Sequence, residues 1–309
     1  MKIIVTGGAG FVGSHLVKLL IEKKYFPIIV DNLSSGKYGY IKKFVDDKKA
    51  SFLKIDIRNY EKLQTIPKAD AVIHLGAIAS VVKSITDPKY VNDVNVLGTL
   101  NMLELCRKRK IKKFVFTSSA AIFGDYNKII SEKTITVPTT VYGSTKLTGE
   151  QYCKIYAKLF KIKIIVLRPF NIYGPRQNEE YAGVIHKFFE KINQNKRPII
   201  YGNGKQTRDF IYVEDIAAVF EKAIRHNNLE NFEIFNLATG KSVSINHLLK
   251  LCLKTKKKNL EPIFRKAIPG VVFHNKSKVS KLQNKLKFKS KIKLEEGLKK
   301  MILEEIRKN

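Results

Sequence analysis

Short apolar runs and longer amphipathic stretches alternate along the first half of the chain. The apolar runs predict strands at Lys2–Val5, Pro27–Val30, Ser51–Lys54, Ala71–Leu75, Lys113–Thr117 and Ile162–Arg168. Apolar residues at three- to four-residue spacing predict two long helices, at about Lys89–Arg107 and Tyr142–Phe160. This β-α-β rhythm is typical of an α/β fold with a doubly wound parallel sheet.

The second half has a looser pattern. Prolines and glycine-rich turns such as GNGK divide it into pieces typical of a smaller lobe of loops and short helices. An amphipathic helix is predicted at its end, roughly Leu294–Ile306. We expect residues 1–168 to form the first domain, with later segments returning to it, and residues 169–309 to form mainly a substrate-binding lobe.

The chain is strongly basic. Its formal net charge is +31, and residues 250–309 hold 19 Lys and Arg against 5 Glu. Nucleic-acid sites combine a basic groove with interleaved aromatic side chains, whereas these lysines are scattered between apolar residues. We interpret the charge as a solvated surface and expect no nucleic-acid partner, although its field would attract an anionic substrate.

Membrane, secretory and metal-binding classes are disfavoured. No run of about 18 apolar residues occurs, so we expect no membrane partner. The N-terminal apolar run is too short for a signal peptide, which favours a cytoplasmic protein. Cys106, Cys153 and Cys252 are isolated and the six histidines form no cluster, so we expect core cysteines and no metal site.

A glycine-rich turn directly follows the first predicted strand. In TGGAGFVGSH, Gly7, Gly10 and Gly13 have GxxGxxG spacing. Such glycines allow a sharp turn, close approach of a pyrophosphate and tight packing of the next helix on the strand. The free amides at the helix start favour phosphate, so the motif predicts a dinucleotide site.

Two aspartates follow the next strands. Asp31 ends the second strand, where a carboxylate accepts hydrogen bonds from the adenosine ribose and repels a 2′-phosphate, which favours NAD over NADP. Asp56, after the third strand, is a candidate acceptor for the adenine amino group or a turn residue.

A third group of residues indicates a site that oxidises an alcohol. Tyr142 and Lys146 are four residues apart at the start of a predicted helix and share a face. We expect the lysine ammonium and a nicotinamide cation to lower the pKa of the phenol, so that it acts as a base. Ser119, at the end of the KFVFTSS strand, can donate to the substrate oxygen.

These segments resemble a known family. TGGAGFVGSH, HLGAIASVVKS, NVLGTLNMLE, TSSAAIFGD, YGSTK, RPFNIYGPRQ, GNGKQTRDFIYVEDIA and FNLATG are similar to the extended short-chain dehydrogenase/reductase family, especially its nucleotide-sugar epimerases and dehydratases, over about residues 2–245. The resemblance implies a Rossmann-like domain, NAD retained through turnover, a UDP-hexose substrate and a homodimer formed through two long helices per subunit.

The resemblance also assigns roles to single residues. Ser119, Tyr142 and Lys146 match the catalytic positions. The implied cofactor-binding residues are Gly7, Gly10, Phe11, Val12, Gly13, Asp31, Asn32, Ser35, Gly36, Asp56, Ile57, Leu75, Ala77, Asn95, Tyr142 and Lys146. The implied substrate-binding residues are Ser80, Lys83, Ser119, Tyr142, Asn171, Val184, Tyr201, Arg208 and Asn275. Arg208 could alternatively form a surface ion pair with Asp209 or Glu214.

At two places the chain departs from the usual sequence of the family, and these departures limit the choice of reaction and substrate. Dehydratases of the family carry Asp-Glu after the serine, and this chain has Ala120 and Ala121, which cannot transfer protons. That favours a 4-epimerase acting on UDP-glucose and UDP-galactose. The run Ala267–Val271 lacks the Arg and Asp of the usual Arg-Pro-Gly-Asp, so the diphosphate clamp differs, and Asn275 is compatible with an N-acetylated sugar.

Other functions stay open. Within the family these are a uronate or N-acetylhexosamine 4-epimerase, a decarboxylase and a keto-sugar reductase. A non-catalytic nucleic-acid or scaffold-binding protein would use the +31 charge instead, but the intact Ser119, Tyr142 and Lys146 argue against it.

Overall fold

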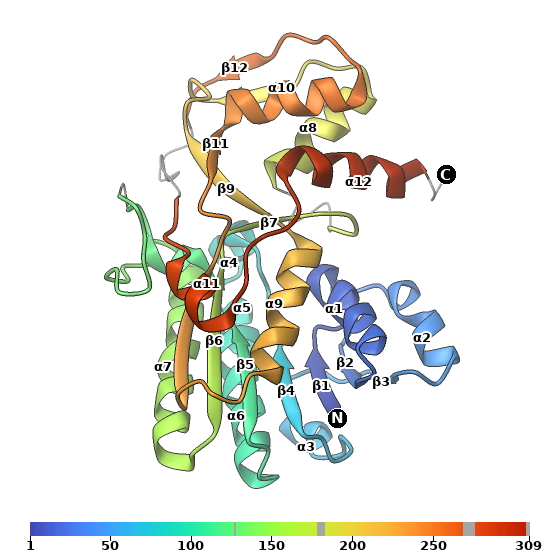
Figure 1. The fold of residues 1–309 in the computed structure, drawn as a ribbon, viewed down its shortest axis with the longest axis vertical. Helices are drawn as coiled ribbons and strands as arrows, with labels where there is room; N and C mark the ends of the chain where they lie inside the picture. The colour runs from blue at the N-terminus through green and yellow to red at the C-terminus, as the bar shows by residue number, and fades with distance from the viewer. Residues whose placement is uncertain (127, 178–182, 268–275, 307–309) are drawn as a thin grey trace.

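Seven parallel strands form the central sheet of the computed structural model, which describes residues 1–126, 128–177, 183–267 and 276–306. Figure 1 shows the strands standing side by side in the order β10-β6-β5-β4-β1-β2-β3. Their bounds are Lys2–Thr6 (β1), Phe26–Val30 (β2), Ser51–Leu53 (β3), Ala71–His74 (β4), Lys113–Thr117 (β5), Lys163–Pro169 (β6) and Phe232–Leu237 (β10). The predicted Rossmann-like doubly wound sheet is confirmed.

The apolar strands are buried on both faces by helices. In β1, Ile3 and Val5 pack into one core and Ile4 into the other. The first core is covered by α1 (Phe11–Glu22), α9 (Val213–Arg225) and α11 (Ser280–Leu286), and the second by α3 (Tyr60–Leu63), α6 (Gly98–Lys108) and α7 (Val141–Phe160). Since α9, β10 and α11 follow the lobe strands in sequence, the chain returns to the first domain.

One predicted helix contains a π-helical segment. The long helix predicted at about Lys89–Arg107 is confirmed as a continuous helical stretch of α5 (Pro88–Asn92), a π-helical segment (Asp93–Leu97) and α6. The apolar spacing gave no sign of the π-helical segment because one extra residue in a turn alters that spacing only slightly. π segments often occur at functional sites.

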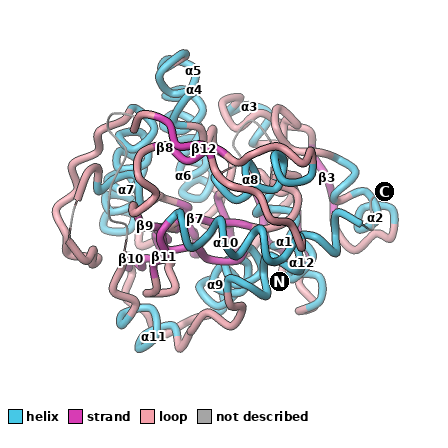
Figure 2. Tube along the Cα trace, turned by 90° about the horizontal axis from the view of Figure 1, so that it is seen from above, coloured by secondary structure: helices cyan, strands magenta, loops and turns pink. Residues whose placement is uncertain are grey.

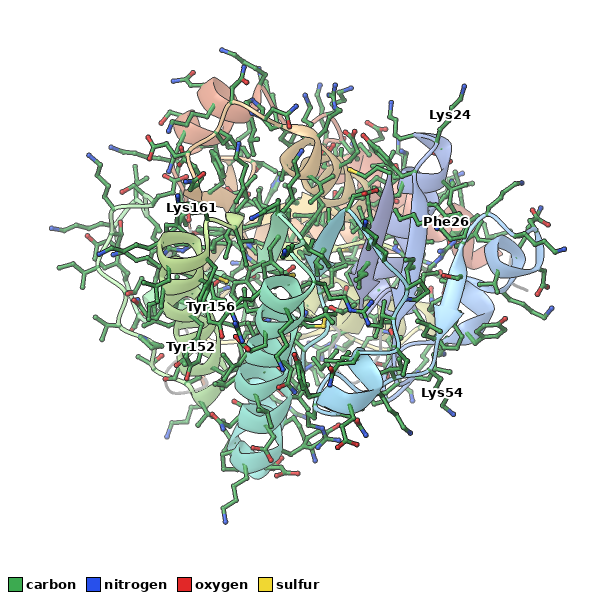
Figure 3. All side chains as sticks on the ribbon, turned by 90° about the horizontal axis from the view of Figure 1, so that it is seen from below. Lys24, Phe26, Lys54, Tyr152, Tyr156 and Lys161 are labelled. Atoms are coloured by element: carbon green, nitrogen blue, oxygen red, sulfur yellow. The ribbon has the colours of Figure 1, made fainter. Side chains whose placement is uncertain are left out.

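Short elements complete the first domain. They are α2 (Lys42–Asp46), α4 (Val81–Thr86) and two 3₁₀ turns, Tyr38–Tyr40 and Ala120–Phe123. At the end of the sheet seen in Figure 3, the exposed lysines Lys24, Lys54 and Lys161 lie at the periphery, as expected of a solvated basic surface. The three cysteines are buried in apolar cores.

The smaller lobe lies above the sheet. It contains the helices α8 (Val184–Asn193), α10 (Ile245–Lys256) and α12 (Leu294–Ile306). The bounds of α12 confirm the helix predicted at the end of the chain. Two small sheets join them, β11-β9-β7 (Ser242–Ser244, Thr207–Tyr212, Asn171–Tyr173) and β12-β8 (Ile263–Arg265, Ile199–Tyr201). Figure 2 looks down on this lobe. The sequence pattern missed the small sheets because three-residue strands leave almost no periodicity.

Candidate functional site

A large cavity lies between the carboxyl ends of the central strands and the smaller lobe. Its volume is about 1440 Å³, and its wall includes the glycine loop, the end of β5, the start of α7 and parts of α8, β8 and β9. The strand order reverses between β4 and β1. Ligands bind at such a switch point in doubly wound sheets because the chain leaves in opposite directions on either side.

The glycine loop is shaped by close backbone contacts. Gly7 has a φ of +67°, and a Cβ there would lie 2.9 Å from the amide nitrogen of Gly76. A Cβ at Gly13 would lie 2.1 Å from the Gly7 carbonyl oxygen, so only glycine lets α1 approach the loop. Gly10 caps α1 without any side-chain hydrogen bond. The first-turn amides therefore remain available for an anion, as a pyrophosphate site requires.

Asp31 lies at the end of β2, in the cavity wall. Its carboxylate accepts hydrogen bonds from the amides of Ala9 (3.0 Å) and Leu33 (2.8 Å). Burial raises the pKa of Asp31, and these two amides oppose that rise. The carboxylate is thus tied to both the glycine loop and the turn after β2, beside the position predicted for a ribose.

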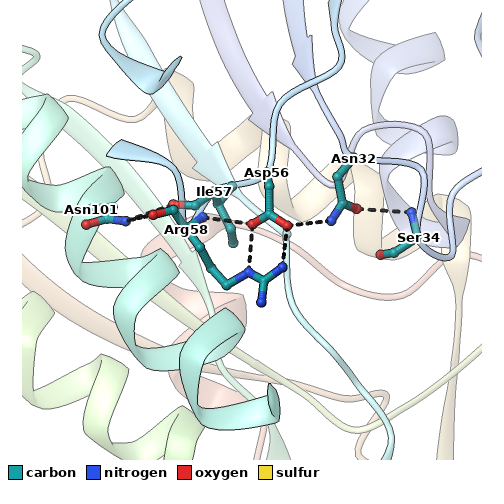
Figure 4. Close-up of polar contacts among 6 residues, drawn as sticks. All are labelled: Asn32, Ser34, Asp56, Ile57, Arg58 and Asn101. Carbon is teal, nitrogen blue, oxygen red and sulfur yellow. Dashed lines mark hydrogen bonds and ion pairs between the residues drawn. The ribbon is translucent and has the colours of Figure 1, made fainter. Parts of the chain in front are cut away.

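Asp56 lies farther along the same wall within a polar cluster (Figure 4). Arg58 donates to both of its oxygens, from Nε at 3.0 Å and Nη2 at 2.8 Å, and Asn32 donates from Nδ2 at 2.9 Å. The Arg58 side chain is the main cause that lowers the pKa of Asp56 to about 2. The carboxylate is therefore ionised at neutral pH and can act only as an acceptor.

Ser119, Tyr142 and Lys146 all line the cavity. Ser119 Oγ accepts a hydrogen bond from the Ala121 amide at 3.1 Å. Lys146 Nζ donates to the Thr117 carbonyl oxygen at 2.9 Å and lies 5.3 Å from the centre of the Phe116 ring. Thr140 caps α7 by accepting from the Gly143 amide, which fixes the turn that carries Tyr142.

The pKa of Tyr142 differs from the one expected from the sequence. Burial raises the pKa of Tyr142, opposed only by the hydrogen bond with Ser119, whereas a lowering by Lys146 was expected. Burial likewise lowers the pKa of Lys146 to about 8. The expectation was wrong for the chain alone because spacing on a helix does not reveal desolvation, which disfavours the charged form of both groups.

Arg208 lies on β9 at the lobe side of the cavity. It is partly buried, and among the described residues its guanidinium donates one hydrogen bond, from Nη1 to the carbonyl oxygen of Thr207 at 2.8 Å. The alternative ion pairs are not formed: Asp209 accepts from Thr239 and Gly240, and Glu214 pairs with Lys300. Burial lowers the pKa of Arg208. A partly buried guanidinium without a carboxylate among the described residues is a strong anion site.

Most other predicted residues also lie in the wall, and four of the described ones do not. The cavity is lined by Phe11, Val12, Asn32, Ser35, Ile57, Leu75, Ala77, Asn171, Val184 and Tyr201. Gly36, Ser80, Lys83 and Asn95 lie outside that wall, and Asn275 lies outside the described residues. Lys83 pairs with Asp87 at 3.4 Å, and Ser80 caps α4 by accepting from the Lys83 amide at 3.0 Å.

Asn95 supports the wall from behind. Its side chain accepts from the Ile78 amide (2.8 Å) and donates to the Ile78 carbonyl (3.1 Å) and to Thr145 Oγ1 (3.0 Å). His74 is also buried, and its Nδ1 lies within 2.7 Å of Thr6 Oγ1, so it packs and hydrogen-bonds behind the wall. The π-helical segment thus joins the loop after β4 to the helix that carries Tyr142.

Several lining residues had no signal in the sequence. Tyr90, Arg176 and Glu304 line the cavity, and Arg176 Nε pairs with Glu304 at 3.3 Å. These residues come from distant segments, so only the folded chain shows that they meet. Among the described residues no group of His, Cys, Asp and Glu could hold a metal ion. Within the same ranges, no helix is both long and apolar enough to cross a membrane.

Comparison with known proteins gives the family. Residues 3–238 match the NAD dependent epimerase/dehydratase family. A Methanocaldococcus jannaschii protein named "Putative UDP-glucose 4-epimerase" is 40% identical over 97% of both chains. The crystal structure of Thermotoga maritima UDP-glucose 4-epimerase with UDP-glucose has a TM-score of 0.92 and 36% identity, covering 100% of this chain and 99% of that one.

A second structure carries a different sugar. UDP-N-acetylglucosamine 4-epimerase from Methanobrevibacter ruminantium, in complex with UDP-N-acetylmuramic acid, has a TM-score of 0.93 and 33% identity, covering 100% of this chain and 99% of that one. These findings confirm the family resemblance, the use of NAD and the isomerase class predicted from the sequence. The chain belongs to the NAD-dependent epimerase/dehydratase family, on its UDP-sugar 4-epimerase side.

Proposed function

We propose that the chain interconverts UDP-glucose and UDP-galactose by transient oxidation at C4 of the sugar. The observation on which this rests is that Ser119, Tyr142 and the buried Lys146 line one cavity with the glycine loop and with Arg208, which has no carboxylate partner among the described residues. A base, a cation, a dinucleotide cradle and an anion site are the parts that this reaction needs.

The described residues fit NAD. Gly7 and Gly13 let the loop and α1 pack closely against the protein backbone, and the free start of α1 suits the pyrophosphate. Asp31 would hold the adenosine ribose and exclude a 2′-phosphate, while Asp56 and Ile57 would face the adenine. Bound NAD supplies a two-electron acceptor that returns the hydride later, so no net oxidation results.

Tyr142 would take and return the proton. The Tyr142 phenolate would remove the proton from the sugar 4-hydroxyl as hydride leaves C4, and the phenol so formed would return the proton when hydride returns to the opposite face of the 4-keto sugar. Because burial raises the pKa of Tyr142, its phenolate needs a neighbouring cation. Lys146, with a pKa lowered to about 8, is still protonated at neutral pH and is placed four residues along the same helix.

Dehydration is disfavoured at this site. Elimination of water needs an additional acid and base beside the serine, and the positions after Ser119 are Ala120 and Ala121. They form a 3₁₀ turn whose amide is bound by Ser119 Oγ. Epimerisation uses only the proton of the 4-hydroxyl, for which Tyr142 suffices.

Arg208 would bind the diphosphate of the nucleotide sugar. Its unpaired guanidinium faces the cavity from β9, and Asn171, which donates to the Asp209 carbonyl at 2.9 Å, holds the neighbouring strand in place. The missing Arg of the Arg-Pro-Gly-Asp run makes Arg208 the main described cation for this task. Binding of the UDP group would thus depend strongly on a single residue.

We also propose a homodimer built on α7 and the π-helical segment. Leu97, Ile155 and Leu159 are 44%, 48% and 63% exposed, so they form an apolar surface on neighbouring elements. A second copy would cover them in the helix-on-helix manner expected from the sequence. Sedimentation analysis of the wild type and Leu159→Glu tests this, since a dimer should dissociate in the variant. The cytoplasmic location stays a prediction.

Turnover of sugars tests the proposal. Purified protein is incubated with UDP-galactose without added reductant, and the products are separated by chromatography; UDP-glucose should form. UDP-glucuronate and UDP-N-acetylglucosamine are run in parallel. If UDP-galactose is not converted but UDP-glucuronate or UDP-N-acetylglucosamine is, the sugar assignment is wrong. In a further incubation with added NADH or NADPH, stoichiometric consumption of the reduced cofactor would identify a reductase instead.

A further inference from the structure

We propose that Arg58 is a positioning residue that orients Asp56 to read the adenine base, and thereby sets the base preference of the NAD site. The inference rests on the proposed assignment of this end of the cavity to adenine. Asp56, Ile57 and Tyr90 line the cavity, whereas Arg58 does not. Arg58 therefore acts from behind the wall, through the carboxylate.

The carboxylate of Asp56 is held at both oxygens. Oδ1 accepts from the Arg58 amide (2.9 Å) and from Arg58 Nε (3.0 Å), and Oδ2 accepts from Arg58 Nη2 (2.8 Å) and Asn32 Nδ2 (2.9 Å). Figure 4 shows the planar fork of Arg58 against Asp56, with Asn32 approaching from the other side. Such bidentate pairing fixes the plane of a carboxylate as well as its charge.

Arg58 is itself held in place. Its carbonyl oxygen accepts from Asn101 Nδ2 at 3.0 Å, a bond that α6 provides, and its guanidinium carbon lies 5.1 Å from the centre of the Tyr90 ring. Tyr90 lies on α5 and faces the cavity on its other side. The fork is thus anchored to the helices that follow β4, independently of any ligand.

The exposed polar groups complement adenine. The Ile57 amide makes no hydrogen bond to the described residues, and it follows directly on the Asp56 acceptor. A donor beside an acceptor matches the Watson–Crick edge of adenine, which offers an acceptor nitrogen and a donating amino group. Hypoxanthine presents the reverse pattern, a donor nitrogen and an accepting carbonyl.

The Asn32 side chain occupies the direction from which Asp56 would accept a hydrogen bond from the adenine amino group. Its amide nitrogen is a donor of the same kind as the adenine amino group, and it occupies one lone-pair direction of Oδ2. Because the other directions are taken by Arg58, an amino group entering the site exchanges with Asn32 rather than with Arg58. Without Arg58 the carboxylate can rotate, and this directional preference is lost.

Binding of two dinucleotides to the nucleotide-free protein tests the inference. Dissociation constants for NAD and nicotinamide hypoxanthine dinucleotide are measured by titration calorimetry for the wild type, Arg58→Ala, Arg58→Lys and Asp56→Asn. The wild type should prefer NAD by about 10-fold or more, the range of a hydrogen bond to a charged group. All three variants should reduce this preference to about 3-fold or less, Arg58→Lys included because it keeps the charge but loses the fork.

Arg107 supplies a matched control. It makes the same kind of bidentate pair with Glu104, at 2.9 and 2.7 Å, and lies over the Phe160 ring with similar side-chain exposure, away from the cavity. Arg107→Ala should leave the preference unchanged. Equal weakening of both dinucleotides in Arg58→Ala would show a merely structural role and overturn the inference. A wild type without base preference would overturn the adenine assignment. Conversion of UDP-galactose by the wild type is measured separately, so failure of the proposed function is distinguished from failure of this inference.

Discussion

Replacement of Lys146 by methionine should abolish activity and yet stabilise the fold. Lys146 is 4% exposed, and burial lowers its pKa from 10.5 to about 8. A shift of this size corresponds to about 3 kcal/mol by which the folded state disfavours the ammonium at neutral pH. Methionine is similar in length, carries no charge and tolerates contact with the Phe116 ring.

Part of this gain is offset. The variant loses the charge-assisted hydrogen bond from Nζ to the Thr117 carbonyl oxygen, which contributes about 1.5–3 kcal/mol. The net stabilisation of Lys146→Met at pH 7 is therefore positive but small, up to about 1.5 kcal/mol. The buried ammonium of Lys146 thus lowers the stability of the folded protein. Such a loss is expected where function requires a buried charge.

The stability difference between the wild type and Lys146→Met should depend on pH. Since the folded-state pKa lies below the unfolded value, the folded chain binds fewer protons than the unfolded chain between about pH 8 and pH 10.5, and wild-type stability rises with pH in this window. The advantage of the variant is full below about pH 8. It should shrink by about 1 kcal/mol between pH 7 and pH 9.

Urea unfolding followed by far-ultraviolet circular dichroism measures this, because the chain has no tryptophan. Nucleotide-free wild type, Lys146→Met and Lys154→Met are compared at pH 7 and pH 9. Lys154 is exposed on the same helix and serves as the control. An Lys146→Met variant less stable than the wild type at pH 7, or a difference that does not change with pH, would refute the reasoning.

Three further changes test the site. Tyr142→Phe should reduce kcat by about 10²–10⁴, the usual contribution of a general base, with NAD still bound in calorimetry; undiminished turnover would rule out the acid-base role. Arg208→Ala should weaken UDP binding by at least about 10-fold because a charge-assisted contact is lost, while NAD affinity stays constant; unchanged UDP affinity would place the diphosphate elsewhere. Gly13→Ala should destabilise the protein by about 2 kcal/mol or more, since its Cβ would lie 2.1 Å from the Gly7 carbonyl, whereas Gly39→Ala, whose Cβ meets nothing within 4 Å, serves as the control in thermal unfolding.

Some residues of the cavity wall could be predicted from the sequence, and others could not. Gly7, Gly13 and Asp31 lie within one β-α-β unit, where spacing along the chain fixes spacing in the fold. Tyr142 and Lys146 lie on one helix, so a separation of four residues places them on one face. Ser80 and Lys83 were expected at the substrate, and they instead cap and pair within α4.

The amino-acid sequence by itself determined the parallel sheet, the glycine loop, the shared helix face of Tyr142 and Lys146, and the last helix, because these depend on the periodicity and spacing of neighbouring residues. Only the tertiary structure decided that Arg208 has no acidic partner among the described residues, that Arg58 donates to both oxygens of Asp56, and that burial raises the pKa of Tyr142. Each of these depends on which distant groups meet and how much water they exclude. Desolvation and long-range pairing are properties of the packed chain and leave no pattern in the order of its residues.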